Sequence, residues 1–355
     1  MRIALIAPPF IPIPPPKYGG TELFVEQLAL GLKALGHEVV VYTNGESTVD
    51  VEKRWLFAES EWPLKDDVYF SLRDLQHHSW AVHDAAKRCD IIHVNNLAGI
   101  AFSKFVNQPF VNTVHHPLEK SLSSFYSHYP NVHHACISHF QAKEHKVLNS
   151  TTIHHGLNES MYRLSEVKED YLVFLGRIAP VKGVHLAIEA AKKAGMPLKI
   201  AGQVQPLYND YFEQQVKPHL DGKNVEFVGE MGLTEKNELL GKARALLFPI
   251  QWHEPFGLVM VESMACGTPV LAFAGGSVAE IVEDGVSGYI CKDTDEMAER
   301  AKTVQLPAKA IRAYVEEKFS LRKMVQGYVD LYEKLLNENR KQPASEGLEL
   351  ESNIA

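Results

Sequence analysis

Apolar positions along the chain fall into short continuous runs separated by longer stretches in which apolar residues recur every three to four positions. Residues 3–7 form one such run, ended by Pro8, as is typical of a strand buried on both faces of a parallel sheet. Residues 22–35 show the helical period and are followed by Gly36, so we predict a helix capped by Thr21. Further runs that predict strands lie at 38–42, 91–94, 110–114, 133–137 and 151–154.

The same alternation begins again near Tyr171. Runs that predict strands lie at 171–175, 198–201, 225–228, 245–248 and 270–272, and stretches that predict helices lie at 184–194, 209–219 and 258–265. Strands that alternate with helices favour parallel pairing in a doubly wound sheet. The pattern therefore predicts an α/β protein with two Rossmann-like domains, residues 1–160 and 161–320, joined by a polar hinge near 156–170.

The C-terminal end of the chain has a different pattern. Residues 321–340 carry Met324, Tyr328 and Leu331 on one face, and we predict a helix that packs back towards the N-terminal domain. Residues 341–355 are polar and acidic, which favours disorder. Because ligands of open α/β sheets bind beyond the carboxyl ends of the strands, we expect the functional residues to follow strands and to face a cleft between the two domains.

Composition narrows the class of protein. The 355 residues are 45% apolar and 23% charged, the formal net charge is −8 and no polybasic cluster occurs. We therefore expect no nucleic-acid binding and at most weak peripheral contact with a membrane. The run at 3–7 is too short for a signal peptide or an integral membrane segment. The four widely spaced cysteines are typical of reduced, buried thiols, which favours the cytoplasm. Nothing in the sequence specifies an oligomeric state.

The segment 176–183 follows a predicted strand, opens a predicted helix and carries two cations. Arg177 and Lys182 lie five positions apart on this loop, so both can reach one anion together with the free amides of the helix N-terminus. Such a cluster suits a diphosphate leaving group, whose negative charge grows as its bond breaks. A pair of solvated surface charges is the alternative interpretation.

Two glutamates form a second constellation. Glu254 and Glu262 are separated by seven residues, which places Glu254 at the mouth of the helix 258–265 and Glu262 about two turns along it. Gly257 between them permits a ligand close to the backbone. One carboxylate can then bind sugar hydroxyls while the other binds ribose hydroxyls. A capping glutamate beside an unrelated exposed glutamate is the alternative interpretation.

Together these segments resemble the C-terminal signature of glycosyltransferase family 4, most clearly in the run EPFGLVMVESMACGTPV that starts at Glu254. The resemblance covers nearly the whole chain. It implies a GT-B fold, in which residues 1–160 bind the acceptor and residues 161–320 bind a nucleotide sugar. By position, Arg177 and Lys182 match the pair that contacts the donor diphosphate. Glu254 matches the acid that binds the transferred sugar, and Glu262 matches the acid that binds the ribose.

The resemblance assigns more residues of the C-terminal domain to the donor. Phe256, Gly257 and Leu258 match a segment whose backbone approaches the sugar and the phosphate. Met231 lies in a stretch that resembles the part of the family's site where the nucleobase lies against backbone. These positions extend the predicted donor site from the phosphates to the base.

On the N-terminal side, Gly19 and Gly20 join a strand to a helix, where a plain turn is the simpler interpretation. In the family, however, this loop lines the cleft, so we assign both glycines to donor binding. His115 aligns with a histidine that touches the transferred sugar. Tyr18 and His116 are candidate acceptor contacts.

We expect no metal and no other cofactor. Fourteen of the 17 histidines lie within residues 1–160, but none has the spacing of a known metal site. Asp293 and Asp295 imitate the acidic pair of metal-dependent glycosyltransferases, yet N-capping of the following helix explains Asp293 better. Two departures from the family affect the cleft: residues 155–158 replace an Asn-Gly-x-Asp turn, and Gln203 stands where a second glycine is common.

The resemblance implies a retaining, metal-independent transfer of a hexose, of glucose, N-acetylglucosamine or mannose type, from a UDP- or GDP-sugar to a hydroxyl acceptor. The alternatives are a non-catalytic subunit that binds a nucleotide sugar and a GT-B-like epimerase or phosphorylase. The pair Glu254 and Glu262 disfavours the epimerase. The absence of a lysine motif for pyridoxal phosphate disfavours one large class of phosphorylase.

Overall fold

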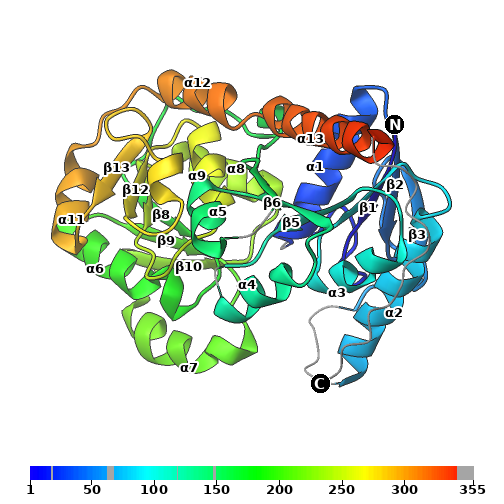
Figure 1. Cartoon of the computed structure of the whole chain (residues 1–355). Coiled ribbons are helices and arrows are strands. Elements are labelled where there is room, and N and C mark those ends of the chain that lie inside the picture. Colours follow the sequence, from blue (N-terminus) through cyan, green and yellow to red (C-terminus); the bar gives the residue numbers. More distant parts are fainter. Residues whose placement is uncertain (17–18, 62–67, 118, 147–148, 342–355) are drawn as a thin grey trace.

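The computed structural model of the protein describes residues 1–16, 19–61, 68–117, 119–146 and 149–341. Two sheets lie side by side, one in each half of the chain (Figure 1). The N-terminal sheet has the strand order β3-β2-β1-β4-β5-β6-β7, and the C-terminal sheet has the order β10-β9-β8-β11-β12-β13. Every pairing in both sheets is parallel. The predicted α/β class with two Rossmann-like units is therefore confirmed.

Both sheets contain strands that are buried along their whole length. The N-terminal strands are β1 (Arg2–Ile6), β2 (Glu38–Thr43), β3 (Glu52–Trp55), β4 (Ile91–Val94), β5 (Phe110–Val114), β6 (Val132–Cys136) and β7 (Ser150–Thr152). The C-terminal strands are β8 (Leu172–Leu175), β9 (Leu198–Ala201), β10 (Val225–Gly229), β11 (Ala245–Phe248), β12 (Val270–Phe273) and β13 (Gly288–Cys291). Strands β4, β5, β6, β8 and β11 are buried at every residue, because helices cover both faces of a parallel sheet. The sequence pattern does not predict the edge strands β3 and β13.

Helices connect the strands in both units. They are α1 (Gly20–Ala34), α2 (Val68–Ala85), α3 (Leu97–Ile100), α4 (Lys120–Ser127), α5 (His139–His145), α6 (Val184–Ala194), α7 (Asn209–Tyr211), α8 (Leu233–Lys242), α9 (Leu258–Ala265), α10 (Val278–Ile281), α11 (Thr294–Thr303), α12 (Ala308–Lys318) and α13 (Leu321–Lys341). Thr21 is not the cap of α1, because the helix already begins at Gly20 and Gly19 holds the capping position at a φ of 155°. The predicted helix 209–219 is helical but irregular beyond α7, since Pro218 has no amide to donate.

The chain passes twice between the two units, and the two crossings are hydrogen-bonded to each other. The amide of Leu157 donates to the carbonyl of Phe319 over 3.0 Å, and the amide of Leu321 donates to the carbonyl of Leu157 over 2.8 Å. A Cβ at Gly156 would lie 2.3 Å from the carbonyl oxygen of Ser320. Glycine is therefore required at this position by the close approach of the second crossing.

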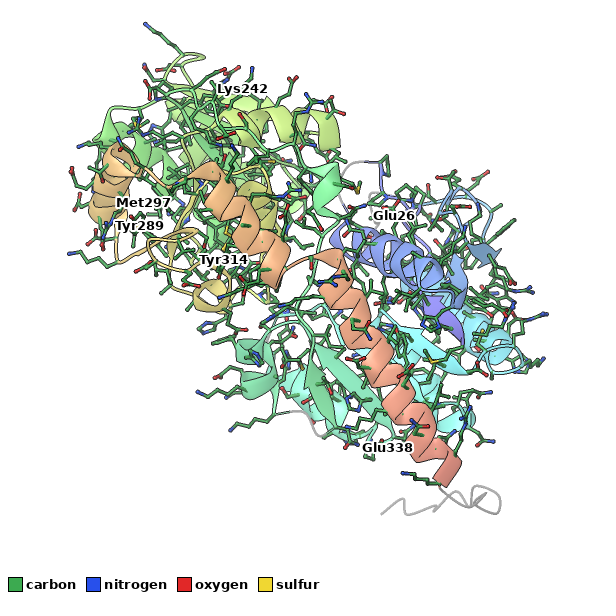
Figure 2. The ribbon with its side chains drawn as sticks, turned by 90° about the horizontal axis from the view of Figure 1, so that it is seen from above. Glu26, Lys242, Tyr289, Met297, Tyr314 and Glu338 are labelled. Carbon is green, nitrogen blue, oxygen red and sulfur yellow. The ribbon has the colours of Figure 1, made fainter. Side chains whose placement is uncertain are left out.

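After the second crossing, α13 runs back along α1 of the N-terminal unit (Figure 2). It buries Met324, Tyr328 and Leu331 against the N-terminal core. The hydroxyl of Tyr332 lies 2.7 Å from Nδ1 of His93 on β4, in a buried polar contact. The C-terminal helix thus completes the core of the N-terminal unit.

Candidate active site

The loop after β8 carries the two predicted cations. Arg177 is half-buried, and within the described residues no hydrogen bond or ion pair reaches its guanidinium. Lys182 ends a short 3₁₀ turn, and Gly183 after it has a φ of 73°. A Cβ on Gly183 would lie 1.9 Å from the carbonyl oxygen of Pro249, so this loop packs directly on the loop that follows β11. Burial lowers the pKa of Lys182, although the carboxylate of Glu254 opposes the shift.

Glu254 lies in the loop after β11, and one of its carboxylate oxygens is fully engaged. Lys182 Nζ lies 2.6 Å from Oε2, and Nε1 of Trp252 donates to the same oxygen over 2.7 Å. The ammonium of Lys182 also lies 4.6 Å above the Trp252 ring. Within the described part of the chain, no hydrogen bond reaches Oε1 of Glu254. That oxygen remains available to a ligand hydroxyl.

Glu262 in α9 repeats this arrangement. Its Oε1 accepts a hydrogen bond of 2.8 Å from the hydroxyl of Tyr162 and lies 2.6 Å from Nζ of Lys236 on α8. No described residue donates to Oε2. Each glutamate is thus held at one oxygen by a lysine and an aromatic side chain, while its other oxygen stays available. Sequence reasoning missed Trp252, Tyr162 and Lys236; only Trp252, two residues before Glu254, lies close enough in sequence to be suspected.

The segment between the two glutamates forms the mouth of α9. Phe256 is buried, and Gly257, at a φ of 85°, caps the helix, which begins at Leu258. Ser277 supports the segment from behind, because its hydroxyl donates to the carbonyl of Phe256 over 2.8 Å and its amide donates to the carbonyl of Glu254 over 2.9 Å. The first amides of a helix have no partner within the helix, so they can bind an anion here.

A row of rings crosses from the N-terminal unit to this segment. His115, directly after β5, stacks on His155 with ring centroids 5.6 Å apart, and His155 meets Phe256 edge-to-face at 5.2 Å. Phe24 of α1 contacts both histidines. Nε2 of His115 lies 3.0 Å from Oδ1 of Asn95. Burial lowers the pKa of His155 to about 3 and lowers that of His115 well below its ordinary value, so both imidazoles are neutral.

The row includes a residue to which sequence reasoning gave no role. His155 stands where the family resemblance implies an asparagine, and its ring lies between His115 and Phe256. Nδ1 of His155 is buried without a hydrogen-bond partner among the described residues. The departure from the family pattern was the only signal in the sequence.

The remaining predicted residues come from both units. Gly19 and Gly20 are at the N-terminus of α1, and a Cβ at Gly20 would meet no atom within 4 Å. His116 follows β5, and its carbonyl accepts a hydrogen bond from Gln141 over 2.9 Å. Met231, between β10 and α8, packs partly buried against the C-terminal core. Tyr18 lies outside the described residues.

A small cavity separates the two units at this point. It measures about 10 Å³, which is room for a single water, and side chains of both units line it, namely Phe24, Gln27, His155, Leu258 and Glu262. The structure therefore brings Glu262 of the C-terminal unit opposite α1 of the N-terminal unit. His155 lines the cavity, and the ring of His115 stacks on the ring of His155.

Two other expectations concern residues outside this region. Asp293 caps α11, and its side chain accepts a hydrogen bond from the amide of Glu296 over 2.9 Å, so the predicted capping role is confirmed. Asp295 pairs with Lys193 over 2.7 Å. Among the described residues, no helix has the length and apolar character needed to cross a membrane.

Known families and sequences resemble this chain along most of its length. The family described as Glycosyltransferase Family 4 matches residues 18–153, and the one described as Glycosyl transferases group 1 matches residues 161–309. An uncharacterized glycosyltransferase of Methanocaldococcus jannaschii is 29% identical over 211 residues, which span 56% of this chain and 59% of that relative. The glycogen synthase of Mycobacterium tuberculosis is 25% identical over 358 residues, with 83% of each chain covered.

Solved structures resemble the whole described fold. The sucrose-phosphate synthase of Thermosynechococcus elongatus has a TM-score of 0.78 at 20% identity, covering 95% of this chain and 99% of that one. HepE of Anabaena, solved in complex with UDP and glucose, has a TM-score of 0.75 at 18% identity, with 94% and 100% covered. At such identities the likeness shows the fold, which is the GT-B arrangement of two Rossmann-like units.

Proposed function

Because the chain belongs to glycosyltransferase family 4, we propose that it transfers a hexose from a UDP- or GDP-sugar to a hydroxyl acceptor, with retention at the anomeric carbon. The observation that carries the proposal is the pairing of Lys182, beside Arg177, with Glu254, together with Glu262 on the adjoining helix α9; each glutamate keeps one oxygen available. Cations suit the diphosphate of such a donor, and carboxylate oxygens suit its hydroxyls.

In this proposal each glutamate binds a different part of the donor through its available oxygen. The loop 176–183, after β8, is called the anion loop. Glu254, beside Lys182 of this loop, accepts from a hydroxyl of the transferred sugar through Oε1. Glu262, just over one turn along α9, accepts from the ribose through Oε2. The amides at the mouth of α9 and the side chains of Arg177 and Lys182 then lie at the diphosphate between them.

Bond breaking builds negative charge on the diphosphate, and fixed positive groups stabilise that charge most when water is excluded. Arg177, Lys182 and the N-terminus of α9 are the positive groups that stabilise the diphosphate here. As the bond to the diphosphate breaks, the acceptor oxygen bonds to the anomeric carbon on the same face, so retention requires no enzymic nucleophile. The leaving phosphate takes the proton of the acceptor hydroxyl and serves as the base. His115, neutral at physiological pH because of its burial, acts as a hydrogen-bonding group towards the sugar and not as a cation.

Because protein cations take the place of a metal, the proposed reaction is metal-independent. Activity in excess EDTA should stay within about twofold of the activity with added Mg²⁺ or Mn²⁺. Loss of activity in the chelator, with recovery on adding either ion, would overturn this part of the proposal. The four cysteines are buried and unpaired, which supports a cytoplasmic setting for the reaction.

Calorimetric titration of two variants with UDP and GDP tests the proposal. Glu254→Ala should keep its affinity for the free nucleoside diphosphate and lose turnover. Glu262→Ala should weaken nucleotide binding by about 1–3 kcal/mol, the scale of hydrogen bonds to a charged group. The reverse pattern would overturn the assigned roles. UDP-glucose is the first donor to assay, since HepE was solved with UDP and glucose. Binding without transfer or hydrolysis of any donor would instead indicate a non-catalytic subunit.

A further inference from the structure

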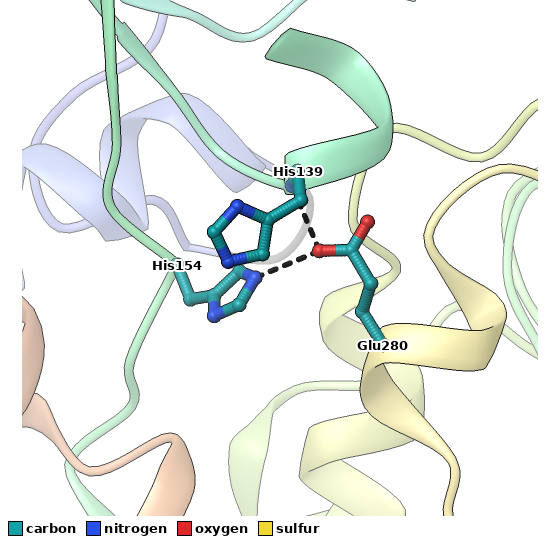
Figure 3. A group of neighbouring side chains, drawn as sticks. All are labelled: His139, His154 and Glu280. Atoms are coloured by element: carbon teal, nitrogen blue, oxygen red, sulfur yellow. Dashed lines mark hydrogen bonds and ion pairs between the residues drawn. The ribbon is translucent and has the colours of Figure 1, made fainter. Parts of the chain in front are cut away.

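Three side chains from the two units converge at a second place in the molecule (Figure 3). His139 is the first residue of α5, His154 follows β7, and Glu280 lies on α10 of the C-terminal unit. One possible ligand atom from each of them lies within 4.8 Å of the others. Nε2 of His154 is 2.9 Å from Oε2 of Glu280. Two imidazoles of one unit therefore meet a carboxylate of the other.

The carboxylate of Glu280 is held in place by backbone amides. The amide of His139 donates to Oε2 over 2.8 Å, and the amide of Phe140 donates to Oε1 over 2.6 Å. These two amides and the contact with His154 fix the orientation of the carboxylate, as hydrogen bonds usually do for carboxylates that bind metals.

The two histidines differ in how firmly they are held. The ring of His154 packs beside Phe256 and Phe319, with centroids 6.0 and 5.9 Å away, which limits its rotation. The ring of His139 is exposed and stands nearly perpendicular to that of His154, with centroids 5.2 Å apart. One imidazole is thus preplaced beside the carboxylate, and the other can adjust to a ligand from the solvent side.

We propose that His139, His154 and Glu280 bind one Zn²⁺ ion and thereby join the two units. Zinc takes imidazole nitrogen at about 2.0–2.1 Å and carboxylate oxygen at about 2.0–2.2 Å, and three protein ligands leave its fourth position to water. When the ion binds, His154 exchanges its hydrogen bond with Glu280 for a bond to the metal. Mg²⁺ does not substitute, because it prefers six oxygen ligands.

None of the three ligands lies on the anion loop or has a role in the proposed transfer, so the ion takes no part in that reaction. Its ligands come from both sides of the molecule, and His154 precedes His155, whose ring lies between His115 and Phe256. Zinc therefore stabilises the arrangement of the two units seen here. A ligand that binds only the folded chain stabilises it by RT ln(1 + [L]/Kd), so the melting temperature continues to rise with the concentration of Zn²⁺ above the Kd.

Titration of the full chain with Zn²⁺ after removal of metals tests the proposal, by calorimetry in the presence of a competing chelator. Wild type should take up one equivalent at this site, and its melting temperature should rise with Zn²⁺ but not with Mg²⁺. His139→Ala and Glu280→Gln should each weaken that binding at least tenfold and abolish the thermal shift. His128→Ala, which removes an exposed histidine of the same unit outside the cluster, should behave as wild type.

Two results would overturn the proposal: a wild-type chain without a saturable zinc site, or both variants binding zinc as tightly as wild type. The exposed side chain of His139 makes no hydrogen bond with another described residue, so its removal should leave the metal-free melting temperature unchanged. The His139→Ala result therefore stands even if Glu280→Gln disturbs the contact between the units. Because binding is the readout, the outcome does not depend on glycosyl transfer.

Discussion

Lys182 combines two roles, because it both neutralises a buried carboxylate and faces the place proposed for the donor diphosphate. Its ammonium is held by Glu254 and lies over the Trp252 ring. A diphosphate competes for the same ammonium, and Arg177 beside it has no competing partner in the described chain. Lys182 is therefore already positioned before the donor arrives.

Lys182→Ala should lower kcat by about 10²-fold or more, because one lost contact to the charge of a transition state costs about 3 kcal/mol. Lys193→Ala is the matched control, since Lys193 lies outside the proposed site, where it pairs with Glu189 and Asp295 and donates to the hydroxyl of Thr294. Steady-state rates of the two variants, each checked for folding, provide the comparison. A folded Lys182→Ala enzyme with wild-type turnover would show that Lys182 is a structural charge only.

The hydroxyl of Tyr162 should determine how well Glu262 binds the nucleotide. Tyr162→Phe removes only the hydrogen bond to Oε1, so the affinity for free nucleoside diphosphate should fall by about 1–2 kcal/mol, or about 5- to 30-fold. Tyr171→Phe removes a buried hydroxyl of the same unit that donates to the carbonyl of Leu239. It should lower stability without changing nucleotide affinity. Equal affinities in the two variants would contradict a positioning role for Tyr162.

At the scale of elements, the site depends on where helices begin. α6 begins after Gly183 and α9 begins after Gly257, and both glycines have positive φ. These residues turn the chain from the carboxyl end of a strand into a helix, so that helix N-termini and the side chains before them meet at one edge of the sheet. The positions of Lys182 and Glu254 therefore follow from the two strand-to-helix turns.

Gly183→Ala should displace the anion loop. An added Cβ there meets the carbonyl oxygen of Pro249, whereas at Gly195, which ends α6 at a φ of 68°, it meets nothing within 4 Å. Both variants carry the strain of a positive φ, about 1–2 kcal/mol. Gly195→Ala should therefore lose only stability, and Gly183→Ala should lose more stability and also turnover. Equal turnover in the two variants would mean that the contact with Pro249 does not position Lys182.

At the scale of the whole molecule, buried neutral histidines couple folding to pH. Burial lowers the pKa of His77, His93 and His155 to about 3 in each case, while an unfolded histidine has a pKa of about 6.5. Below pH 6.5 these histidines become protonated in the unfolded chain but stay neutral in the folded chain. The stability is therefore fully present above about pH 6.5 and is lost as the pH falls towards 3.

Each such histidine should lower the free energy of unfolding by about 1.4 kcal/mol per pH unit over this range. Urea unfolding at pH 7, 6 and 5 should show a steep decrease for wild type. His93→Gln should have a slope smaller by about that amount, although it also weakens the contact with Tyr332 of α13. Parallel lines for the two proteins would show that His93 is protonated in the folded state.

The sequence alone determined the two sheets and most of the proposed donor site. Strands buried on both faces are mostly apolar, so the runs that form β8 and β11 can be predicted without tertiary information. The edge strand β3 has a neighbouring strand on one side only, so it can carry Glu52, Lys53 and Arg54. It therefore lacks the apolar run that predicts a buried strand. The residues of the anion loop lie close together in the sequence, as do Glu254 and Glu262, so their spacing was enough to predict a donor-binding role.

Only the tertiary structure decided which side chains hold the glutamates and which cross between the units. Tyr162 is 100 residues from Glu262, and His154 is 126 residues from Glu280. No periodicity connects such positions, because their contacts arise when separately formed strands, helices and units pack together. The ring of His155 reaches Phe256 for the same reason. Local pattern determines which segments form strands and helices, and packing between distant segments determines which polar atoms meet and which remain available to a ligand.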